Sequence, residues 1–508
     1  MILTTAEESR RLDRCAMEEF GLPEAVLMEN AGASVIRLMQ PEISWENARI
    51  VIVCGTGNNG GDGFVAARYA SAAGAEVTVL LMGNVSHMGE VSLMYKNVID
   101  KMGIPVIPIS DAEEAEEYLS RADVIIDALI GTGLKNNVDE KKAALITCMN
   151  DSRALIISVD TPSGMLTDSG EAAGAVVNAD FTVALGAVKR GHVLYPGSEY
   201  AGEVMYSPIG IPEEARTDYS VRITEKEDVY GFLPVRSRIS HKGNHGFIGV
   251  FAGSEGMAGA GLLAAQGALY SGAGKIALAT VEKTAGVLAG KVPEIMVSSC
   301  GKEPYFTKGM VSLCLKKAED YQAIAIGPGL GRAEETQLFV KEFLSSVRKP
   351  VVVDADALFA VAEQKMDIKE CPGQLILTPH VGEFARLTGR PAREIEACRI
   401  DAAIEFATAN HVVLVLKGAP TVVAVPDGRA WINPTGNPGM ASGGMGDTLT
   451  GIIAALLGQK MEAEEAAVAG VYLHGLAGDM LAETNPVGYT AGDLARQIPA
   501  ARSRVMEA

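Results

Sequence analysis

Short, continuous runs of apolar residues alternate with helical stretches through the N-terminal half of this chain, and this alternation is the strongest constraint on its fold. A strand that is apolar on both faces is typical of a parallel sheet covered by helices on both sides. We therefore predict a doubly wound, Rossmann-like α/β sheet, whose ligands bind beyond the carboxyl ends of the strands. The predicted strands lie at residues 49–54, 76–82, 124–129, 155–159 and 181–185.

Two helices are predicted before the first of these strands. Thr5 and Glu8 have the spacing of a capping box, which indicates a helix that continues to about residue 19. A second helical pattern covers about residues 24–39.

The length of the chain, 508 residues, exceeds what one hydrophobic core supports, since about 150 residues per domain is usual. The alternation stops between residues 207 and 224, where two prolines and mixed polar residues indicate a boundary. Strand and helix patterns then start again, without a residue-level repeat of the first half. We predict two α/β domains, residues 1–215 and residues 225–508.

Charge and cysteine usage restrict the partners. A formal net charge of −19 argues against nucleic acid or an anionic membrane as the main partner. The seven cysteines are scattered singly, so a disulfide framework or zinc site is not expected. The first residues contain no apolar targeting core, and no run approaches the 18 or more apolar residues of a membrane span. We expect a cytoplasmic homo-oligomer that acts on small molecules.

A glycine-rich turn follows the first strand, at residues 55–63, and contains the spacing Gly-x-Gly-x-x-Gly. Alone this is a weak sign of dinucleotide binding. In NAD-dependent dehydrogenases an acid about 20 residues further on holds the ribose hydroxyls. The next strand ends in residues 80–84 without a carboxylate, which argues against a dehydrogenase.

Two further strand ends carry acids. Asp127 is followed by the glycines of residues 131–133, and Asp160 by Ser163. Because the ends of parallel strands meet at one edge of a sheet, Asn59, Asp127, Asp160 and Ser163 are predicted to share one pocket. Their oxygen atoms suit a hard cation. The alternative is that each aspartate caps the helix that follows it.

The densest glycine cluster lies at residues 437–451, where five of fifteen residues are glycine and Asp447 follows closely. Apolar residues at helical spacing come directly afterwards, so a buried helix is predicted from about Gly446. A helix start of this kind binds phosphate or an oxyanion, and an acid beside it can deprotonate a hydroxyl. In the alternative interpretation, the turn only allows close helix packing and Asp447 is a cap.

Most other strands of the second half also end in polar or glycine-rich turns. These turns lie at residues 327–331, 354–356, 378–383 and 417–418, and a hairpin is predicted over residues 421–433 with its turn at Asp427 and Gly428. His241 and His245 lie close together, but no carboxylate or cysteine accompanies them at ligand spacing, so a metal site there is disfavoured.

The N-terminal motifs resemble the N-terminal domain of the NAD(P)H-hydrate repair enzymes, which epimerises the R and S forms of hydrated NAD(P)H, abbreviated NAD(P)HX. The resemblance rests on residues 28–32, 58–63, 127–133 and 160–164. It implies that Asn59, Asp127 and Ser163 hold a potassium ion, and that Asp160 handles the proton or hydroxyl at C6. It also implies a hydrate pocket made of Asn58, Asn59, Gly60, Gly61, Asp62, Gly131, Thr132, Gly133, Leu134, Lys135, Asn136, Asn137 and Asp160.

The C-terminal motifs together resemble the ribokinase-like superfamily, specifically the nucleotide-dependent NAD(P)H-hydrate dehydratases. The resemblance implies that Asp447 is catalytic and that Gly443, Gly444 and Gly446 form an anion hole. The hydrate would contact Ala260, Gly329, His380 and Asp447. The nucleotide would contact Lys417, Gly418, Ala419, Pro420, Thr421 and Gly446.

The expected function is therefore the repair of hydrated NAD(P)H. ADP, with magnesium, would donate a phosphoryl group to the C6 hydroxyl of the S form and leave AMP. Loss of phosphate would then regenerate NAD(P)H. The sequence does not separate ADP from ATP as donor. Two alternatives stay open at this stage: a small-molecule kinase acting on a hydroxyethylthiazole or hydroxymethylpyrimidine, and a binding or scaffold role for the N-terminal domain.

Overall fold

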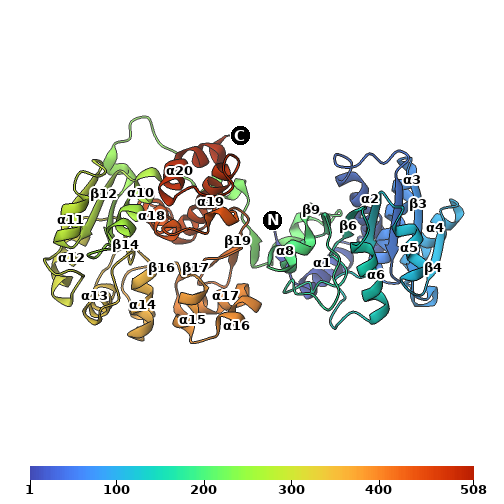
Figure 1. Cartoon of the computed structure of the whole chain (residues 1–508), viewed down its shortest axis with the longest axis horizontal. Helices are drawn as coiled ribbons and strands as arrows, with labels where there is room; N and C mark the ends of the chain where they lie inside the picture. Colours follow the sequence, from blue (N-terminus) through green and yellow to red (C-terminus); the bar gives the residue numbers. More distant parts are fainter. Residues whose placement is uncertain (508) are drawn as a thin grey trace. The chain divides into compact units, whose positions relative to one another are not determined.

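The computed structural model describes residues 1–507. The chain divides into two compact units, Met1–Val221 and a second unit that begins at Arg222 (Figure 1). This division falls within the segment 207–224, while the domain limits 1–215 and 225–508 stay a prediction. No helix in the described part of the chain has both the length and the apolar character needed to cross a membrane.

The first unit contains a seven-stranded sheet in the order β4-β3-β2-β5-β6-β7-β9, in which every strand pair is parallel. The order reverses between β2 and β5, so a crevice opens there at the carboxyl ends of the strands. The strands are β2 (Arg49–Cys54), β3 (Glu76–Met82), β4 (Val106–Ile109), β5 (Val124–Ala128), β6 (Leu155–Val159), β7 (Phe181–Leu185) and β9 (Glu203–Ser207). A separate parallel pair joins β1 (Leu3–Thr4) and β8 (Val188–Lys189).

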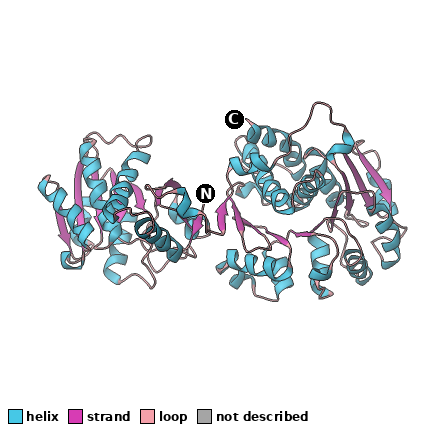
Figure 2. Ribbon diagram, turned by 180° about the vertical axis from the view of Figure 1, so that it is seen from behind, coloured by secondary structure: helices cyan, strands magenta, loops and turns pink. Residues whose placement is uncertain are grey.

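Helices cover both faces of this sheet (Figure 2). Successive residues of a strand point to opposite faces, so Ile52 of β2 packs with α2–α4 and its neighbour Val53 with α5 and α6. Both residues are fully buried, as a continuous apolar run requires. The helices are α1 (Ala6–Glu18), α2 (Glu24–Leu38), α3 (Asn58–Ala72), α4 (Glu90–Lys101), α5 (Glu113–Leu119), α6 (Glu140–Asn150), α7 (Arg190–Val193) and α8 (Gly197–Ala201).

The second unit contains a ten-stranded sheet in the order β10-β19-β18-β17-β16-β15-β14-β11-β12-β13. The neighbouring strands from β13 to β17 in this order are parallel, whereas β18 pairs antiparallel with both β17 and β19. The strands are β10 (Val221–Ile223), β11 (Phe247–Phe251), β12 (Lys275–Thr280), β13 (Ile295–Ser299), β14 (Ala323–Ile326), β15 (Val351–Val353), β16 (Leu375–Leu377), β17 (Val413–Leu416), β18 (Thr421–Ala424) and β19 (Ala430–Asn433).

One face of this sheet carries the C-terminal helices. Residues of α9, α10, α18, α19 and α20 share one hydrophobic cluster with the strands, and Figure 1 shows α10, α18, α19 and α20 gathered together. The helices are α9 (Lys226–Phe232), α10 (Ala258–Tyr270), α11 (Glu282–Leu288), α12 (Val311–Ala318), α13 (Glu334–Leu344), α14 (Ala355–Glu363), α15 (Val381–Thr388), α16 (Ala392–Ala397), α17 (Arg399–Asn410), α18 (Met445–Gly458), α19 (Ala463–Ala482) and α20 (Ala491–Met506).

The predicted α/β class and the individual elements agree with the structure. The capping box of Thr5 and Glu8 is present at α1, and the hairpin appears as β18 and β19. The helix expected from about Gly446 begins at Met445.

Candidate active sites

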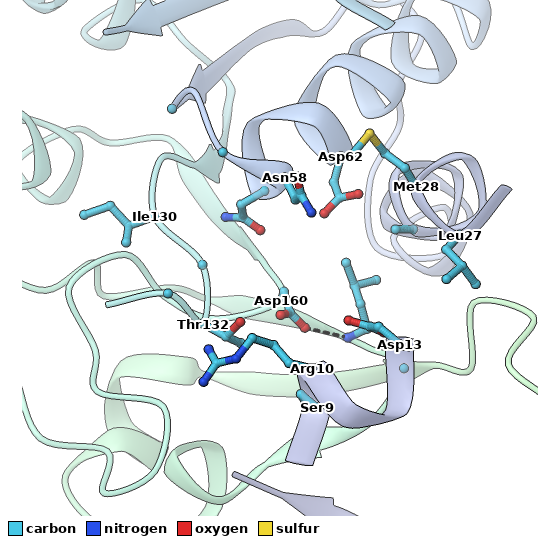
Figure 3. Close-up of a pocket in the computed structure, with 18 of the residues that line it drawn as sticks. Ser9, Arg10, Asp13, Leu27, Met28, Asn58, Asp62, Ile130, Thr132 and Asp160 are labelled. Carbon is cyan, nitrogen blue, oxygen red and sulfur yellow. Dashed lines mark hydrogen bonds between the residues drawn. The ribbon is translucent and has the colours of Figure 1, made fainter. Parts of the chain in front are cut away.

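A cavity of about 510 Å³ lies at the carboxyl ends of the strands in the first unit (Figure 3). Its wall includes two glycine-rich turns, one after β2 and one after β5, together with residues of α1 and α2. Seven residues of the predicted hydrate pocket are in the wall. They are Asn58, Asn59, Asp62, Gly131, Thr132, Gly133 and, at the end of β6, Asp160. Most of the predicted hydrate pocket is thus brought together.

The remaining residues of that predicted pocket are not in the cavity wall. Gly60 and Gly61 are buried in the first turn of α3, and Gly60 packs so closely on the preceding turn that a methyl group would overlap the carbonyl oxygen of Gly55. The segment of Leu134, Lys135, Asn136 and Asn137 is mostly exposed and lies outside the cavity wall. Their contact with substrate stays a prediction.

Asp160 is held by Lys189, a residue that the sequence reasoning did not single out. The buried Lys189 ammonium forms an ion pair with Oδ1 of Asp160. It also donates to the backbone oxygens of Leu185 at 2.7 Å and Ala187 at 2.9 Å, and the N–H of Leu185 donates to Asp160 at 2.9 Å. A lysine four residues after the apolar run 181–185 was the only sequence signal for this pair.

Arg10 of α1 is a second residue that the sequence did not indicate. Its half-buried side chain lines the cavity near Thr132 (Figure 3). Lys142, another cation in the wall, is paired with Asp139, whereas no hydrogen bond or ion pair of the Arg10 guanidinium is found among the described residues. Arg10 is therefore available for an anionic group of a ligand.

Asp127 and Ser163 lie buried beneath the cavity rather than in its wall. The Asp127 carboxylate accepts hydrogen bonds from the Ser163 hydroxyl at 2.6 Å, the Ser163 N–H at 2.8 Å and the Ser158 hydroxyl at 2.9 Å. Burial raises the pKa of Asp127, and the serine hydrogen bonds oppose this effect. Asp127 therefore accepts hydrogen bonds from Ser163 in the turn after β6 and does not cap a helix.

In the second unit, the glycine-rich turn leads into α18 as the sequence predicted. Gly444 takes a left-handed backbone conformation with φ of +92°, which glycine adopts without strain. The N–H groups of Met445, Gly446 and Asp447 stand at the helix start, where the helix itself offers no acceptor. No side-chain cap is found at α18, so the interpretation of Asp447 as a cap is not supported.

An ion pair lies beside this helix start. The buried carboxylate of Asp354, which follows β15, accepts from Lys417 Nζ at 2.8 Å and from the Thr450 hydroxyl at 2.7 Å. Lys417 also lies 4.0 Å from Glu383. Burial alone would lower the pKa of Lys417, but Asp354 and Glu383 outweigh burial and the pKa is raised. Lys417 is thus a charged group in this site.

Asp447 lies next to this ion pair. Burial raises the pKa of Asp447 to about 7, with a further rise from the Asp354 carboxylate and an opposing effect of Lys417. A carboxyl group with this pKa can accept a proton near neutral pH and is suited to general base catalysis. A methyl group on Gly446 would lie 3.3 Å from Lys417 Nζ, which places the helix start against the lysine.

The other predicted residues of this unit fall into two places. His380 is exposed and pairs across a β-bridge with Lys417, so it borders the ion pair. Gly329 and Ala260 are close to each other, since a methyl group on Gly329 would lie 3.1 Å from the Ala260 side chain. Residue 260 is one turn before Leu263 on α10, and Leu263 packs against Gly444.

Two buried residues that the sequence did not indicate support α18 and the segment that the sequence predicts to contact the nucleotide. The guanidinium of Arg399 donates to the carbonyl oxygens of Leu416 and Lys417, directly before the segment of Gly418, Ala419, Pro420 and Thr421. His474 lies 3.0 Å from the carbonyl oxygen of Met445, and burial lowers the pKa of His474 to about 4. The neutral imidazole donates this hydrogen bond.

Family models match both units of the chain, and solved structures match about half of it. The model of the NAD(P)H-hydrate dehydratase family matches residues 248–500, and that described as YjeF-related protein N-terminus matches residues 24–191. An ADP/ATP-dependent NAD(P)H-hydrate dehydratase from Bacillus subtilis is 38% identical, covers 56% of this chain and 99% of its own, and has a TM-score of 0.50. A ribokinase-like superfamily protein from Enterococcus faecalis is 28% identical, covers 56% and 96%, and has a TM-score of 0.51.

A Rossmann-like unit is thus joined in one chain to a unit of ribokinase-like fold. The bifunctional NAD(P)H-hydrate repair enzyme Nnr of Thermofilum pendens is 42% identical over 514 residues, which cover 100% of this chain and 97% of that protein. The chain belongs to the bifunctional NAD(P)H-hydrate repair enzymes.

Proposed function

We propose that the first unit interconverts the R and S epimers of NAD(P)HX and that the second dehydrates the S epimer to NAD(P)H, using ADP and releasing AMP and phosphate. The Asp447 carboxyl beside the free N–H groups of α18 is the observation that carries the second activity. The membership of the chain in the repair family supports the combination. The alternative function, that of a small-molecule kinase, would need only the second unit. It would leave the cavity of the first unit without a role.

In the dehydratase site, Asp447 accepts the proton of the C6 hydroxyl as that oxygen attacks the terminal phosphorus of the nucleotide. The N–H groups of Met445, Gly446 and Asp447, with the positive end of the α18 dipole, stabilise the charge on the transferred phosphoryl oxygens. Lys417 neutralises charge on the nucleotide phosphates. The C6–O bond then breaks with phosphate as the leaving group while the lone pair of the ring nitrogen forms a C=N bond. Loss of a proton from C5 to water forms the C5=C6 double bond and restores the conjugated dihydropyridine.

Magnesium fits the donors of this site. Among the described residues no group of three or more His, Cys, Asp or Glu side chains could hold a metal ion. Magnesium in nucleotide sites needs only one or two carboxylates, because phosphates and water supply the other ligands. Asp354 and Glu383, which both lie near Lys417, would supply them. When bound, magnesium neutralises the phosphates of the donor.

Potassium fits the donors beneath the epimerase cavity. Oδ1 of Asn59, the carboxylate of Asp127, the hydroxyl of Ser163 and the carbonyl oxygen of Ile130 are gathered around the turn after β5. The Asn59 amide nitrogen is buried without a hydrogen-bond partner. A buried carboxylate without a basic partner matches a cation that compensates its charge. Potassium would fix the two turns that form the cavity wall.

The full-length chain tests this proposal. Mixed NADHX epimers are incubated with ADP and magnesium, and NADH absorbance is followed. The wild-type chain restores all of the NADH. Asp160→Asn restores only the S epimer at the enzymatic rate, and the remainder follows at the rate of spontaneous epimerisation. Asp447→Asn lowers the dehydration rate by about 10²-fold or more. Full activity of Asp447→Asn, or a stable phosphorylated product, would contradict the proposal.

A further inference from the structure

The epimerase cavity holds more acidic groups than its nearest cation can compensate. Asp13 of α1, Glu24 of α2, Asp62 of α3 and Asp160 after β6 all line it. Lys189 is committed to one of them, because it pairs with Asp160 and donates its other protons to two backbone carbonyls. One carboxylate of the cavity is therefore charge-compensated, and the others are not.

Asp62 has an environment opposite to that of Asp160. Among the described residues its carboxyl group has no hydrogen bond and no ion pair, although its side chain is partly buried in the wall. Burial raises the pKa of Asp62 well above its ordinary value; the carboxylates of Asp160, Asp13 and Glu24 add to this rise, and Lys189 opposes it. The surroundings of Asp62 therefore favour its protonated form, whereas the Asp160 carboxylate has Lys189 as an ion-pair partner.

The two aspartates also lie on different walls of the same cavity. Asp62 comes from α3, and Asp160 follows β6 (Figure 3), where it pairs with Lys189. Two acid/base groups placed in this way can serve the two faces of a planar ring between them. Asp62 is suited to donate a proton and Asp160 to accept one. Different environments can give two carboxyl groups these opposite roles.

Epimerisation at C6 requires this combination. The C6 carbon carries a hydroxyl group and is bonded to the ring nitrogen, so it is a hemiaminal carbon. Its configuration is lost when the C–O bond breaks and the nitrogen lone pair forms a C=N bond, which makes C6 planar. Water must then add to the face opposite to the one from which the first oxygen departed.

We propose that Asp62 is a second catalytic residue of the epimerase site, which protonates the departing C6 hydroxyl while Asp160 accepts a proton from the water that adds to the other face. The C6–O electron pair leaves with the first oxygen, which departs as water. The attacking water supplies the new C6–O bond, and the C=N electron pair returns to the ring nitrogen. This inference rests on the proposed epimerase function.

The step balances and is reversible. After one inversion Asp160 carries the proton and Asp62 is ionised, which is the arrangement that the reverse inversion needs. Proton exchange with solvent in the open cavity restores the starting arrangement. One oxygen atom of the substrate is replaced by one from water at each inversion, and no other reactant is consumed.

The Asp62→Asn variant of the full-length chain tests the inference, because asparagine keeps the size of the side chain and removes its acidic proton. Interconversion of the separated NADHX epimers is followed by chromatography without ADP, so that the dehydratase is inactive, with the spontaneous rate subtracted. We expect kcat to fall by about 10²-fold or more. Dehydration of the S epimer with ADP by the same variant is expected to be unchanged and shows that the chain is folded.

Asp151→Asn is the matched control, because it makes the same replacement at an exposed aspartate of the first unit that does not line the cavity. Its kcat for epimerisation is expected to stay within about fivefold of wild type, against the 10²-fold scale of general acid catalysis. An equal loss in both variants would overturn the inference, since the effect would then not depend on a carboxyl group of the cavity.

Oxygen-18-labelled water gives a second measurement. The inference predicts that each enzymatic inversion places one labelled oxygen at C6, and inversion with retention of the original oxygen would overturn it. Wild-type activity in Asp62→Asn would also overturn it while leaving the epimerase function intact. Absence of epimerisation by the wild-type chain would instead contradict the proposed function itself.

Discussion

Lys417 Nζ lies 2.8 Å from Oδ1 of Asp354, and this contact joins the end of β17 to the end of β15 beneath the start of α18. Thr450 of α18 donates to the other oxygen of the same carboxylate. Asp354 thus connects both strand ends to α18. Lys417 keeps a fixed position because its partner, the Asp354 carboxylate, is buried.

A double-mutant cycle on this pair is the first prediction. Asp354→Asn and Lys417→Met each leave one buried charge without its partner, which costs about 3 kcal/mol of unfolding free energy. The double variant is expected to lose less than the sum of the two, by about 1–3 kcal/mol. Urea unfolding of the second unit is followed by Trp431 fluorescence in a Trp45→Phe background, since the chain has two tryptophans, one in each unit. Strict additivity would show that the contact contributes nothing.

Activity in the same cycle should separate stability from function. All three variants lose Lys417 or its fixed position, so each is expected to have a raised KM for ADP. The double variant should regain stability without regaining nucleotide affinity. Recovery of wild-type KM in the double variant would contradict a nucleotide role for Lys417.

Dehydration is predicted to depend on pH through Asp447. The pKa of Asp447 is raised by burial and by Asp354 to about 7, and the base must be ionised to accept a proton. kcat/KM should therefore be low at about pH 5, rise through about pH 7 and level off above it. Because the pKa of Asp447 is higher in the folded than in the unfolded state, the protonated carboxyl group favours the folded state. This contribution to the unfolding free energy is fully present below the unfolded pKa and is lost as pH rises through about 7. Asp447→Asn should thus be relatively more stable at about pH 8 than at about pH 5.

Potassium is predicted to stabilise the first unit through Asp127. A ligand that binds only the folded state at 100 times its Kd adds about 2.7 kcal/mol to the unfolding free energy. Trp45 fluorescence in a Trp431→Phe background should show this shift in KCl and not in choline chloride at equal ionic strength. Because burial raises the pKa of Asp127 and a cation favours the ionised form, the shift should grow as pH rises. Asp127→Asn should abolish it, whereas an equal effect of choline would exclude a specific site.

Arg10 is predicted to bind a phosphate of the hydrate. Its side chain lines the epimerase cavity and has no acidic partner among the described residues, whereas the other lining cations are paired. Arg10→Ala should raise KM for epimerisation by about tenfold, the scale of one charge-assisted hydrogen bond, with little change in kcat. Arg14→Ala is the matched control, because Arg14 is exposed on the same helix and does not line the cavity. Equal KM values for the two variants would contradict this role.

The sequence predicted the elements of this fold well because apolar runs and glycine-rich turns are local signals. The predicted strands 49–54 and 76–82 coincide with β2 and β3, and the acid of the 437–451 cluster lies at the start of α18. Short or edge strands such as β4 and β9 gave no comparable run. The turns of the candidate sites were found for the same local reason.

Pairs between distant residues could not be predicted in the same way. Lys189 and Asp160 are separated by 29 positions, and Lys417 and Asp354 by 63. Which strands are neighbours depends on the sheet order, which no local pattern encodes. The order places the ends of β2, β5 and β6 at one cavity, and only then does Lys189 meet Asp160. The contribution of Arg10 from α1 has the same origin.

Close packing of Gly60 in the turn after β2 gives the last prediction. Alanine favours a helix interior over glycine by about 1 kcal/mol, so Gly60→Ala would stabilise α3 if space allowed. However, the added methyl group would overlap the carbonyl oxygen of Gly55, which is backbone and cannot rotate away. The turn or the helix must therefore shift, and we expect a net loss of about 1–3 kcal/mol from the first unit. Gly57→Ala is the matched control in the same turn, because nothing lies within 4 Å of its added methyl group. Urea unfolding followed by Trp45 in the Trp431→Phe background should separate the two variants, and equal stabilities would show that the turn yields to Gly60→Ala without cost.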